Sequence, residues 1–301
     1  MGTLALTRYR PALPALAAAM ALVFPAAATG QQTSAPARQP DVHFVPTDTT
    51  KVREMLSAAD VTARDTVYDL GCGDGRFVIT AVKTYKAQRG VCVDIDPLRI
   101  KESKSNADTA GVLKKIEFVE GDLFEQDLSK ATVVTLYLLP SLNVRLRPKL
   151  FREVPAGTRI VSNAFDMGDW KADRTMTVKT NSGMQSYAYL WIMPADVSGR
   201  WRLKAEGGSA KEYTLDVKQK YQEVSGTATS GGEAAPLTNF TVKGNQVAFS
   251  LGKGADRTEF TGKVSDGKAS GTAKGKGGTF SWSATRTKPG ERPDTLATEG
   301  T

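Results

Sequence analysis

The sequence VYDLGCGDGR at residues 67–76 is the strongest indication of the fold. An apolar, β-prone run leads to Asp69, a glycine-rich turn follows, and residues 77–82 continue with a helix-compatible pattern. Strand, tight turn and helix in this order make the first βα unit of an open α/β sheet, where nucleotides bind. The glycines, Gly71, Gly73 and Gly75, have no Cβ, so the backbone can turn sharply and approach a ligand closely.

The spacing of these glycines argues against two common nucleotide sites. A dinucleotide fingerprint needs G-x-G-x-x-G, but here the third glycine comes one residue early and is followed by Arg76. A P-loop is excluded because no Gly-Lys-Ser/Thr follows. Asp69 at the strand end would repel a diphosphate and attract an ammonium group. S-adenosylmethionine (SAM), which carries an amino acid ammonium and no phosphate, therefore fits this turn better than NAD.

Two more carboxylates follow short strand patterns further along the chain. The stretch GVCVDIDP at 90–97 contains Asp94, which lies 25 residues after Asp69, as expected for the next strand of a parallel βαβ unit. A carboxylate there can accept hydrogen bonds from ribose hydroxyls. The stretch IEFVEGDL at 116–123 contains Asp122, which is placed to accept a hydrogen bond from an adenine amino group.

These ordered motifs resemble those of the class I, Rossmann-like SAM-dependent methyltransferases over about residues 40–194. The resemblance implies that Asp69 and the glycines hold the methionyl part of SAM, Asp94 the ribose, and Asp122 with Leu123 the adenine. The full set of cofactor-binding residues expected from it is Thr47, Asp69, Gly71, Gly73, Asp74, Asp94, Ile95, Asp122 and Leu123. The alternative is a doubly wound domain with ordinary turn glycines and solvated aspartates.

A closer resemblance is to the methyltransferases that modify lysines of the ATP synthase c-subunit and of the adenine nucleotide translocase. It rests on FVPT at 44–47, DLGCGDGR at 69–76 and the aromatic loop from Phe165 to Trp170. It implies protein-lysine N-methylation, with a protein or other amine as the acceptor. It also places the helix that begins near Asp48 or Thr49 as a lid over the methionyl end; packing of that helix on the sheet edge is the alternative.

The loops after the fourth and fifth expected strands should border the transferred methyl group. The residues expected to line the substrate pocket are Tyr137, Pro140, Asn163, Phe165 and Trp170. The aromatic side chains among them can wall an amine by cation–π contact, and Asp166 or Asp169 can orient it as the catalytic carboxylate. Alternatively, the aromatic residues pack in the core and the aspartates cap turns. A single histidine, His43, and no clustered ligands argue against a metal site.

The chain pattern predicts an α/β, Rossmann-like methyltransferase sheet that ends in an antiparallel hairpin, followed by a small all-β domain. Expected strands are 66–70, 90–94, 116–119, 132–138 and 158–163, with helices at 74–87, 97–110 and after 140, and a hairpin from 174–179 and 186–193. Short strands with period-two patterns then recur at 199–205, 211–219, 221–229, 238–242, 246–251, 257–264, 268–273 and 279–286. They favour an antiparallel barrel or sandwich, with a lipocalin-like or avidin-like cup as one form.

The N-terminus has the layout of a secretory signal peptide. Two arginines precede an Ala/Leu-rich run that is too short for a confident membrane span, and small residues follow it. We therefore expect an exported protein, periplasmic or extracellular; tethering by an uncleaved N-terminus is the alternative. The expected division is 1–30 signal peptide, 31–41 linker, 42–194 methyltransferase domain, 195–287 β domain and 288–301 disordered tail.

Charge and cysteine content add weaker constraints. The net charge of +8 falls to about +6 without residues 1–30, which favours association with an acidic envelope or membrane surface only mildly. No basic run is interleaved with aromatics, so nucleic acid is not expected as a partner. The pattern favours Cys72 and Cys92 as small buried side chains and leaves a bridge between them open.

Two other functions remain to be weighed against a methyltransferase. The first is a non-catalytic exported protein that keeps the SAM or nucleoside pocket while its β domain binds an envelope ligand. Export favours this reading, because the supply of SAM outside the cytoplasm is uncertain. The second is an NAD-binding oxidoreductase, which the glycine spacing and Asp69 disfavour.

Overall fold

The computed structural model describes residues 1–2, 40, 42–179, 183, 185–206 and 211–291. The chain divides into two units, Met1–Ala37 and Arg38–Thr301. Nearly all of the expected signal peptide and linker lies outside the described residues, as does most of the expected C-terminal tail. The fold below is that of the second unit.

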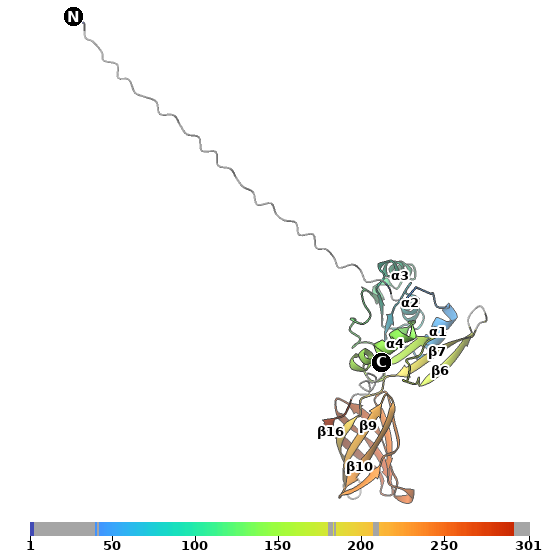
Figure 1. The fold of residues 1–301 in the computed structure, drawn as a ribbon, viewed down its shortest axis with the longest axis vertical. Coiled ribbons are helices and arrows are strands. Elements are labelled where there is room, and N and C mark those ends of the chain that lie inside the picture. The colour runs from blue at the N-terminus through green and yellow to red at the C-terminus, as the bar shows by residue number, and fades with distance from the viewer. Residues whose placement is uncertain (3–39, 41, 180–182, 184, 207–210, 292–301) are drawn as a thin grey trace. The chain divides into compact units, whose positions relative to one another are not determined.

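A seven-stranded sheet forms the first half of this unit, with the strand order β3-β2-β1-β4-β5-β7-β6. Figure 1 labels its last two strands, β7 and β6, which lie side by side. Its strands are β1 (Thr66–Leu70), β2 (Arg89–Asp94), β3 (Ile116–Glu120), β4 (Val133–Leu136), β5 (Arg159–Asn163), β6 (Arg174–Lys179) and β7 (Gln185–Ile192). The first five are mutually parallel, whereas β7 is antiparallel to both β5 and β6. The expected Rossmann-like methyltransferase sheet with its terminal hairpin is thus confirmed.

Two of the four α-helices that accompany these strands begin at a capping aspartate. The helices are α1 (Thr49–Ala58), α2 (Arg76–Lys83), α3 (Pro97–Thr109) and α4 (Pro140–Glu153), with a short 3₁₀ helix, η1 (Leu113–Lys115). Asp48 caps α1 by accepting a hydrogen bond from the backbone N–H of Thr50, and Asp96 caps α3 in the same way through Leu98. Proline is the first residue of both α3 and α4, where its missing N–H costs nothing.

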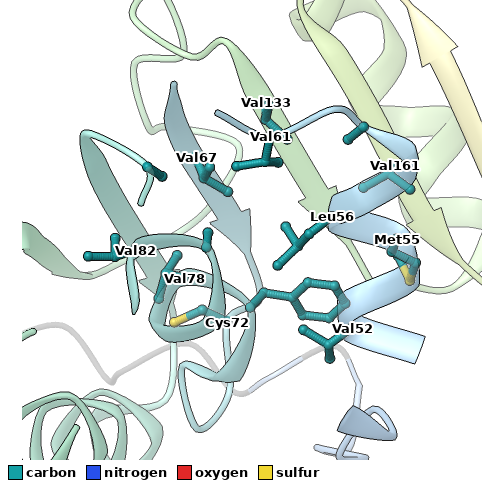
Figure 2. Packing of buried hydrophobic residues seen from close by; sticks show 14 of the residues in the cluster. Val52, Met55, Leu56, Val61, Val67, Cys72, Val78, Val82, Val133 and Val161 are labelled. Atoms are coloured by element: carbon teal, nitrogen blue, oxygen red, sulfur yellow. The ribbon is translucent and has the colours of Figure 1, made fainter. Parts of the chain in front are cut away.

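Alternate residues of the strands bury opposite faces of the sheet. Val67, Val133 and Val161 pack in one cluster with residues of α1, α2 and α3. Figure 2 shows the side chains of Val52, Met55 and Leu56 on α1 close to strand side chains of this cluster, such as Val161. The neighbouring strand residues, such as Leu70 and Leu136, instead pack with α4. The two faces together bury the strands almost completely, as a parallel sheet requires.

The second half is an antiparallel sheet of nine strands, ordered β11-β10-β9-β8-β16-β15-β14-β13-β12. Its strands are β8 (Gly199–Ala205), β9 (Lys211–Lys220), β10 (Glu223–Ser230), β11 (Glu233–Pro236), β12 (Thr238–Lys243), β13 (Gln246–Leu251), β14 (Thr258–Ser265), β15 (Lys268–Gly275) and β16 (Gly278–Pro289), with a 3₁₀ turn, η2 (Gly254–Asp256), before β14. The sheet curls so that Leu237, just before β12, donates a backbone hydrogen bond of 2.9 Å to Gly226 of β10. The sheet is therefore nearly barrel-shaped, as the sequence predicted.

The inward side chains of this curled sheet form one packed cluster. The rings of Phe249, Phe260 and Trp282 lie 4.8–6.1 Å apart between centroids, and Trp201 belongs to the same cluster. These aromatics fill the interior that a lipocalin-like cup would leave for a ligand. Two details differ from expectation: the short strand β11 was not predicted, and β16 continues to Pro289, into the segment expected to be a disordered tail.

No helix among the described residues is both long enough and apolar enough to span a membrane.

Candidate active site

The glycine-rich loop, residues 71–76 and hereafter the cofactor loop, is fixed to the end of β2. The backbone N–H groups of Gly71 and Cys72 both donate to the carbonyl of Val93, at 2.8 and 3.0 Å. The N–H of Gly73 donates to Oδ2 of Asp94 at 2.8 Å. All three glycines have positive φ, between 55° and 83°, a region that other residues rarely occupy. The loop conformation thus depends directly on the glycines that the sequence singled out.

A disulfide between Cys72 and Cys92 reinforces this attachment. Parallel pairing sets Asp69 of β1 opposite Cys92 of β2, and the turn then brings Cys72 back within 5.3 Å of Cys92 between Cα atoms. Both cysteines are buried. The sequence favoured two separate small side chains, and this is corrected: the bridge forms because the turn folds back onto the neighbouring strand.

Asp69 is a buried acid at the end of β1. The residue is 3% exposed, and its Oδ1 accepts a hydrogen bond of 2.6 Å from the hydroxyl of Thr135 on β4. Burial raises the pKa of the Asp69 carboxyl to about 8, and the nearby charges of Asp94 and Asp74 add to this although the Thr135 hydrogen bond opposes it. The structure shows no ion pair to Asp69 from the described residues. A cationic ligand group would supply the missing partner.

The other two predicted carboxylates stand at the ends of β2 and β3. Oδ1 of Asp94 accepts from the N–H of Asp96 at 3.0 Å, and the Asp94 carbonyl accepts from the N–H of Gly121 at 2.9 Å. Asp122, one residue later, accepts from the N–H of Phe124 at 2.9 Å. Ile95 and Leu123 are half-buried beside these acids. The structure therefore brings the expected ribose and adenine residues to adjacent strand ends at the same edge of the sheet.

Asp74 and Thr47, also predicted to bind the cofactor, are both linked to Arg76. The guanidinium of Arg76 contacts both carboxylate oxygens of Asp74, at 2.5–3.1 Å, and also donates to the carbonyl of Thr47. Phe44 lies directly above the cofactor loop, since a Cβ at Gly73 would collide with its ring. The segment before α1 thus lies against the loop, whereas α1 itself packs against the sheet through Val52, Met55 and Leu56, as in the alternative to the expected lid.

Most of the residues predicted to line the substrate pocket lie at the ends of β4 and β5. The rings of Tyr137 and Phe165 are nearly parallel, with centroids 6.3 Å apart and an interplanar angle of 23°. Asn163 is 4% exposed and donates from Nδ2 to the hydroxyl oxygen of Thr47 at 3.0 Å. Pro140 is exposed at the start of α4. Tyr137, Phe165 and Asn163 thus lie at neighbouring strand ends, as predicted for a substrate pocket.

Asp169 and Trp170 have a different environment from the one expected of pocket residues. Trp170 is 1% exposed, packs against Phe151 at 4.6 Å between ring centroids, and donates from its indole nitrogen to Gln222 at 2.9 Å. Such a buried indole has no free face for an amine. Asp169 bonds to Arg147, Lys220 and the Tyr221 hydroxyl.

These partners determine the ionisation of Asp169. Partial burial raises its pKa, but the hydrogen bonds from Arg147, Tyr221 and Lys220 outweigh that effect and lower the pKa to about 2. A carboxyl group with so low a pKa is a poor proton acceptor at neutral pH. Asp166, by contrast, is exposed, and its Oδ1 accepts from the N–H of Gly168 at 3.1 Å.

Three residues of the site were missed by the sequence reasoning. Thr135 gave no signal, because it is one β-branched residue in an apolar strand. Arg76 was noted as breaking the dinucleotide pattern and as part of the DLGCGDGR motif, but it was given no role in the site. Asn143 interrupts the leucines that face the sheet from α4, and that polar residue on an apolar face was the available clue: its Nδ2 donates to the carbonyls of Phe165 and Asp166 at 3.3 and 3.0 Å.

The residues at this edge fit SAM. The buried carboxyl of Asp69, for which the described residues supply no ion pair, suits the ammonium of the methionyl group. The glycines of the cofactor loop carry no side chain, so a ligand can approach the loop backbone closely. A pyrophosphate would instead meet Asp69, Asp74 and Asp94 together.

Comparison with known proteins agrees with this chemistry. A family model described as the ANTKMT methyltransferase domain matches residues 69–174. A protein-lysine N-methyltransferase of Saccharolobus islandicus is 42% identical over 154 residues, which are 51% of this chain and 95% of that protein. The chain belongs to the ANTKMT methyltransferase family.

Other similar proteins cover smaller shares. The human ATP synthase c-subunit lysine N-methyltransferase is 28% identical over 130 residues, 43% of this chain and 54% of the human protein. A solved structure of an RNA methyltransferase from Salinibacter ruber, in complex with S-adenosyl-L-homocysteine, has 51% identity and a TM-score of 0.46, and the match covers 49% of this chain and 93% of that one.

The protein is a SAM-dependent methyltransferase. The family model ends at residue 174, so it does not include the nine-stranded sheet.

We predict that SAM binding releases a proton through Asp69. In the free protein a pKa of about 8 keeps most of this carboxyl protonated at pH 7. The ligand ammonium favours the ionised form and so lowers the pKa in the complex. Binding at pH 7 should therefore release close to one proton, and affinity should rise between pH 6 and about 7.5, above which the SAM amine itself begins to lose its proton.

Calorimetry in two buffers of different ionisation enthalpy measures this proton. Asp69→Asn should bind SAM more weakly and without proton release. A wild-type binding enthalpy that is the same in both buffers would show that Asp69 does not meet the ammonium.

We predict that Asp94→Ala severely weakens SAM binding. The change removes the acceptor for the Gly73 N–H and for the ribose hydroxyls, and losing two hydrogen bonds to a charged group costs about 3 kcal/mol, or roughly 100-fold in Kd. Asp108→Ala, at an exposed acid on α3, is the matched control and should leave Kd unchanged. Equal affinities for the two variants would show that the ribose site lies elsewhere.

Proposed function

We propose that this enzyme transfers the methyl group of SAM to a lysine ε-amine of a protein. The observation that carries the proposal is the 42% identity to a protein-lysine N-methyltransferase across 95% of that protein's length. The human relative that acts, by its name, on a lysine of the ATP synthase c-subunit supports the same acceptor class. The buried carboxyl of Asp69 and the paired rings of Tyr137 and Phe165, both at strand ends of the same sheet, support the proposal.

The cofactor residues have distinct tasks in this proposal. When bound, SAM supplies an electrophilic methyl group on a sulfonium. Asp69 holds the methionyl ammonium, Asp94 accepts from the ribose hydroxyls, and Asp122 with Leu123 contacts the adenine. The disulfide and the backbone hydrogen bonds to the Val93 carbonyl hold the cofactor loop in place before the ligand binds. Binding therefore costs less conformational entropy of the loop.

The acceptor side needs a rigid loop, because in-line displacement depends on alignment of nucleophile, methyl carbon and sulfur. Asn143 on α4 is fully buried, and its side chain donates hydrogen bonds to the carbonyls of Phe165 and Asp166. This fixes the Phe165 ring opposite Tyr137. The two rings then form the wall along which the apolar stem and the amine of a lysine approach.

A lysine amine is protonated at neutral pH and must lose a proton before it attacks. Of the two candidate carboxylates, Asp166 is the better acceptor for that proton, because three cationic or hydroxyl donors stabilise the anion of Asp169. We therefore assign proton removal or steering to Asp166. Asp169 instead holds its own loop to Arg147, Lys220 and Tyr221.

A methyl-transfer assay with radiolabelled SAM and an envelope protein extract tests the proposal. We expect label in protein, recovered as methyl-lysine after hydrolysis. Asp166→Asn should lower the rate at least about tenfold at neutral pH, whereas Asp169→Asn should have a smaller effect on it. SAM binding with no transfer would favour the non-catalytic alternative, and label in RNA would contradict a protein acceptor.

We also propose that the enzyme works outside the cytoplasm. The N-terminal pattern of a signal peptide supports this, and so does the buried Cys72–Cys92 disulfide, since structural disulfides persist in oxidising compartments and are rare in the cytosol. The SAM it needs would then have to reach that compartment.

The thiol state and the N-terminus of the native protein test export. Denatured protein from the envelope fraction should resist alkylation until it is reduced, and should then take up two labels. Its mass should lack about the first 30 residues. A cytoplasmic, unprocessed protein whose cysteines alkylate without reduction would contradict export; the Cys72→Ser/Cys92→Ser variant sets the background.

A further inference from the structure

The segment Phe44–Thr47, hereafter the strap, contacts the cofactor loop at two points. The ring of Phe44 covers Gly73 and also contacts the guanidinium of Arg99, which lies 4.9 Å from the ring centroid. Arg76 of the cofactor loop donates to the Thr47 carbonyl while it is paired with Asp74. Arg76 therefore links the carboxylate of Asp74 in the cofactor loop to the backbone of Thr47 in the strap.

The strap also contacts the acceptor side, through the side chain of the same residue. Oγ1 of Thr47 accepts from Nδ2 of Asn163 at 3.0 Å, and the two residues are 5% and 4% exposed. A hydrogen bond in so dry a place is costly to break, because neither group finds water as a substitute. The carbonyl and the hydroxyl of one residue thus join two loops that are separated by about 90 positions in sequence.

Asn163 is the first residue of the acceptor loop, residues 163–169. The loop turns sharply there: Ala164 has a positive φ of 66°, and the N–H of Phe165 donates to the Asn163 carbonyl at 2.8 Å. A left-handed alanine is held only where its surroundings fix it. The orientation of Asn163 consequently determines the position from which the Phe165 side chain extends.

We propose that Thr47 is a positioning residue that couples the cofactor loop to the acceptor loop. The path runs from Asp74 through Arg76 to the Thr47 carbonyl, and from the Thr47 hydroxyl to Asn163. Cofactor binding at the glycine turn orders the first part, and the path orders the acceptor loop in turn. The inference rests on the proposed methyl transfer for its purpose, but the coupling itself can be measured without any acceptor.

Amide hydrogen exchange of the acceptor loop tests this coupling in the full chain. Thr47→Val keeps the side-chain shape and loses the oxygen, whereas Thr47→Ser keeps the oxygen; Asn163→Ala removes the other end of the same bond. Without ligand, exchange at Ala164 and Phe165 should be about fivefold faster in Thr47→Val and Asn163→Ala than in wild type or Thr47→Ser. Exchange in β14 and β15 should be unchanged, which controls for global destabilisation.

Saturating S-adenosyl-L-homocysteine, with occupancy checked by calorimetry, supplies the second comparison. It should protect the acceptor loop in wild type and in Thr47→Ser but not in Thr47→Val, even when the ligand is bound. Equal loop exchange in Thr47→Val and wild type, free and saturated, would overturn the coupling. Failure of the wild type to bind this ligand would contradict the proposed cofactor site instead, and the unliganded comparison would still decide whether the bond to Asn163 orders the loop.

Discussion

The burial of Asp69 is the constraint on which the rest of the site depends. An acid with no cation beside it is unfavourable in a folded protein, and the raised pKa of Asp69 reflects that cost. Natural sequences keep such groups where a ligand completes them. The hydrogen bond from Thr135 holds the carboxyl near the end of β1, two residues before the glycine turn begins. The site is in this sense built for a cationic, phosphate-free ligand.

Around this acid the chain fixes its loops in more than one way. The cofactor loop is attached to β2 by amide hydrogen bonds and by the Cys72–Cys92 disulfide. The acceptor loop is held by Asn143 from α4 and by Thr47 from the strap. Asp169 at its far end, and Trp170 directly after it, contact Tyr221 and Gln222 at the turn between β9 and β10. The nine-stranded sheet is therefore in contact with the same loop that carries Phe165.

Much of the fold can be predicted from short stretches of sequence, because the apolar runs and turn residues that define the strands are close together in the chain. The bounds of β1, β6 and β8 match the predicted strands, since each is a short run ended by turn residues. The three predicted cofactor acids meet at one edge because parallel strands end together. The disulfide could not be derived, because it depends on how far the turn folds back onto β2. The environment of Trp170 depends on Tyr221, 51 residues later, which no local pattern reveals.

The glycine turn and Asp69 together make this edge of the sheet a SAM site rather than a dinucleotide site. Calorimetric titration of the purified protein with SAM and, separately, with NAD distinguishes the two. We expect saturable binding of one SAM per chain and no binding of NAD at the same concentrations. Binding of NAD with no binding of SAM would instead assign the loop to a dinucleotide.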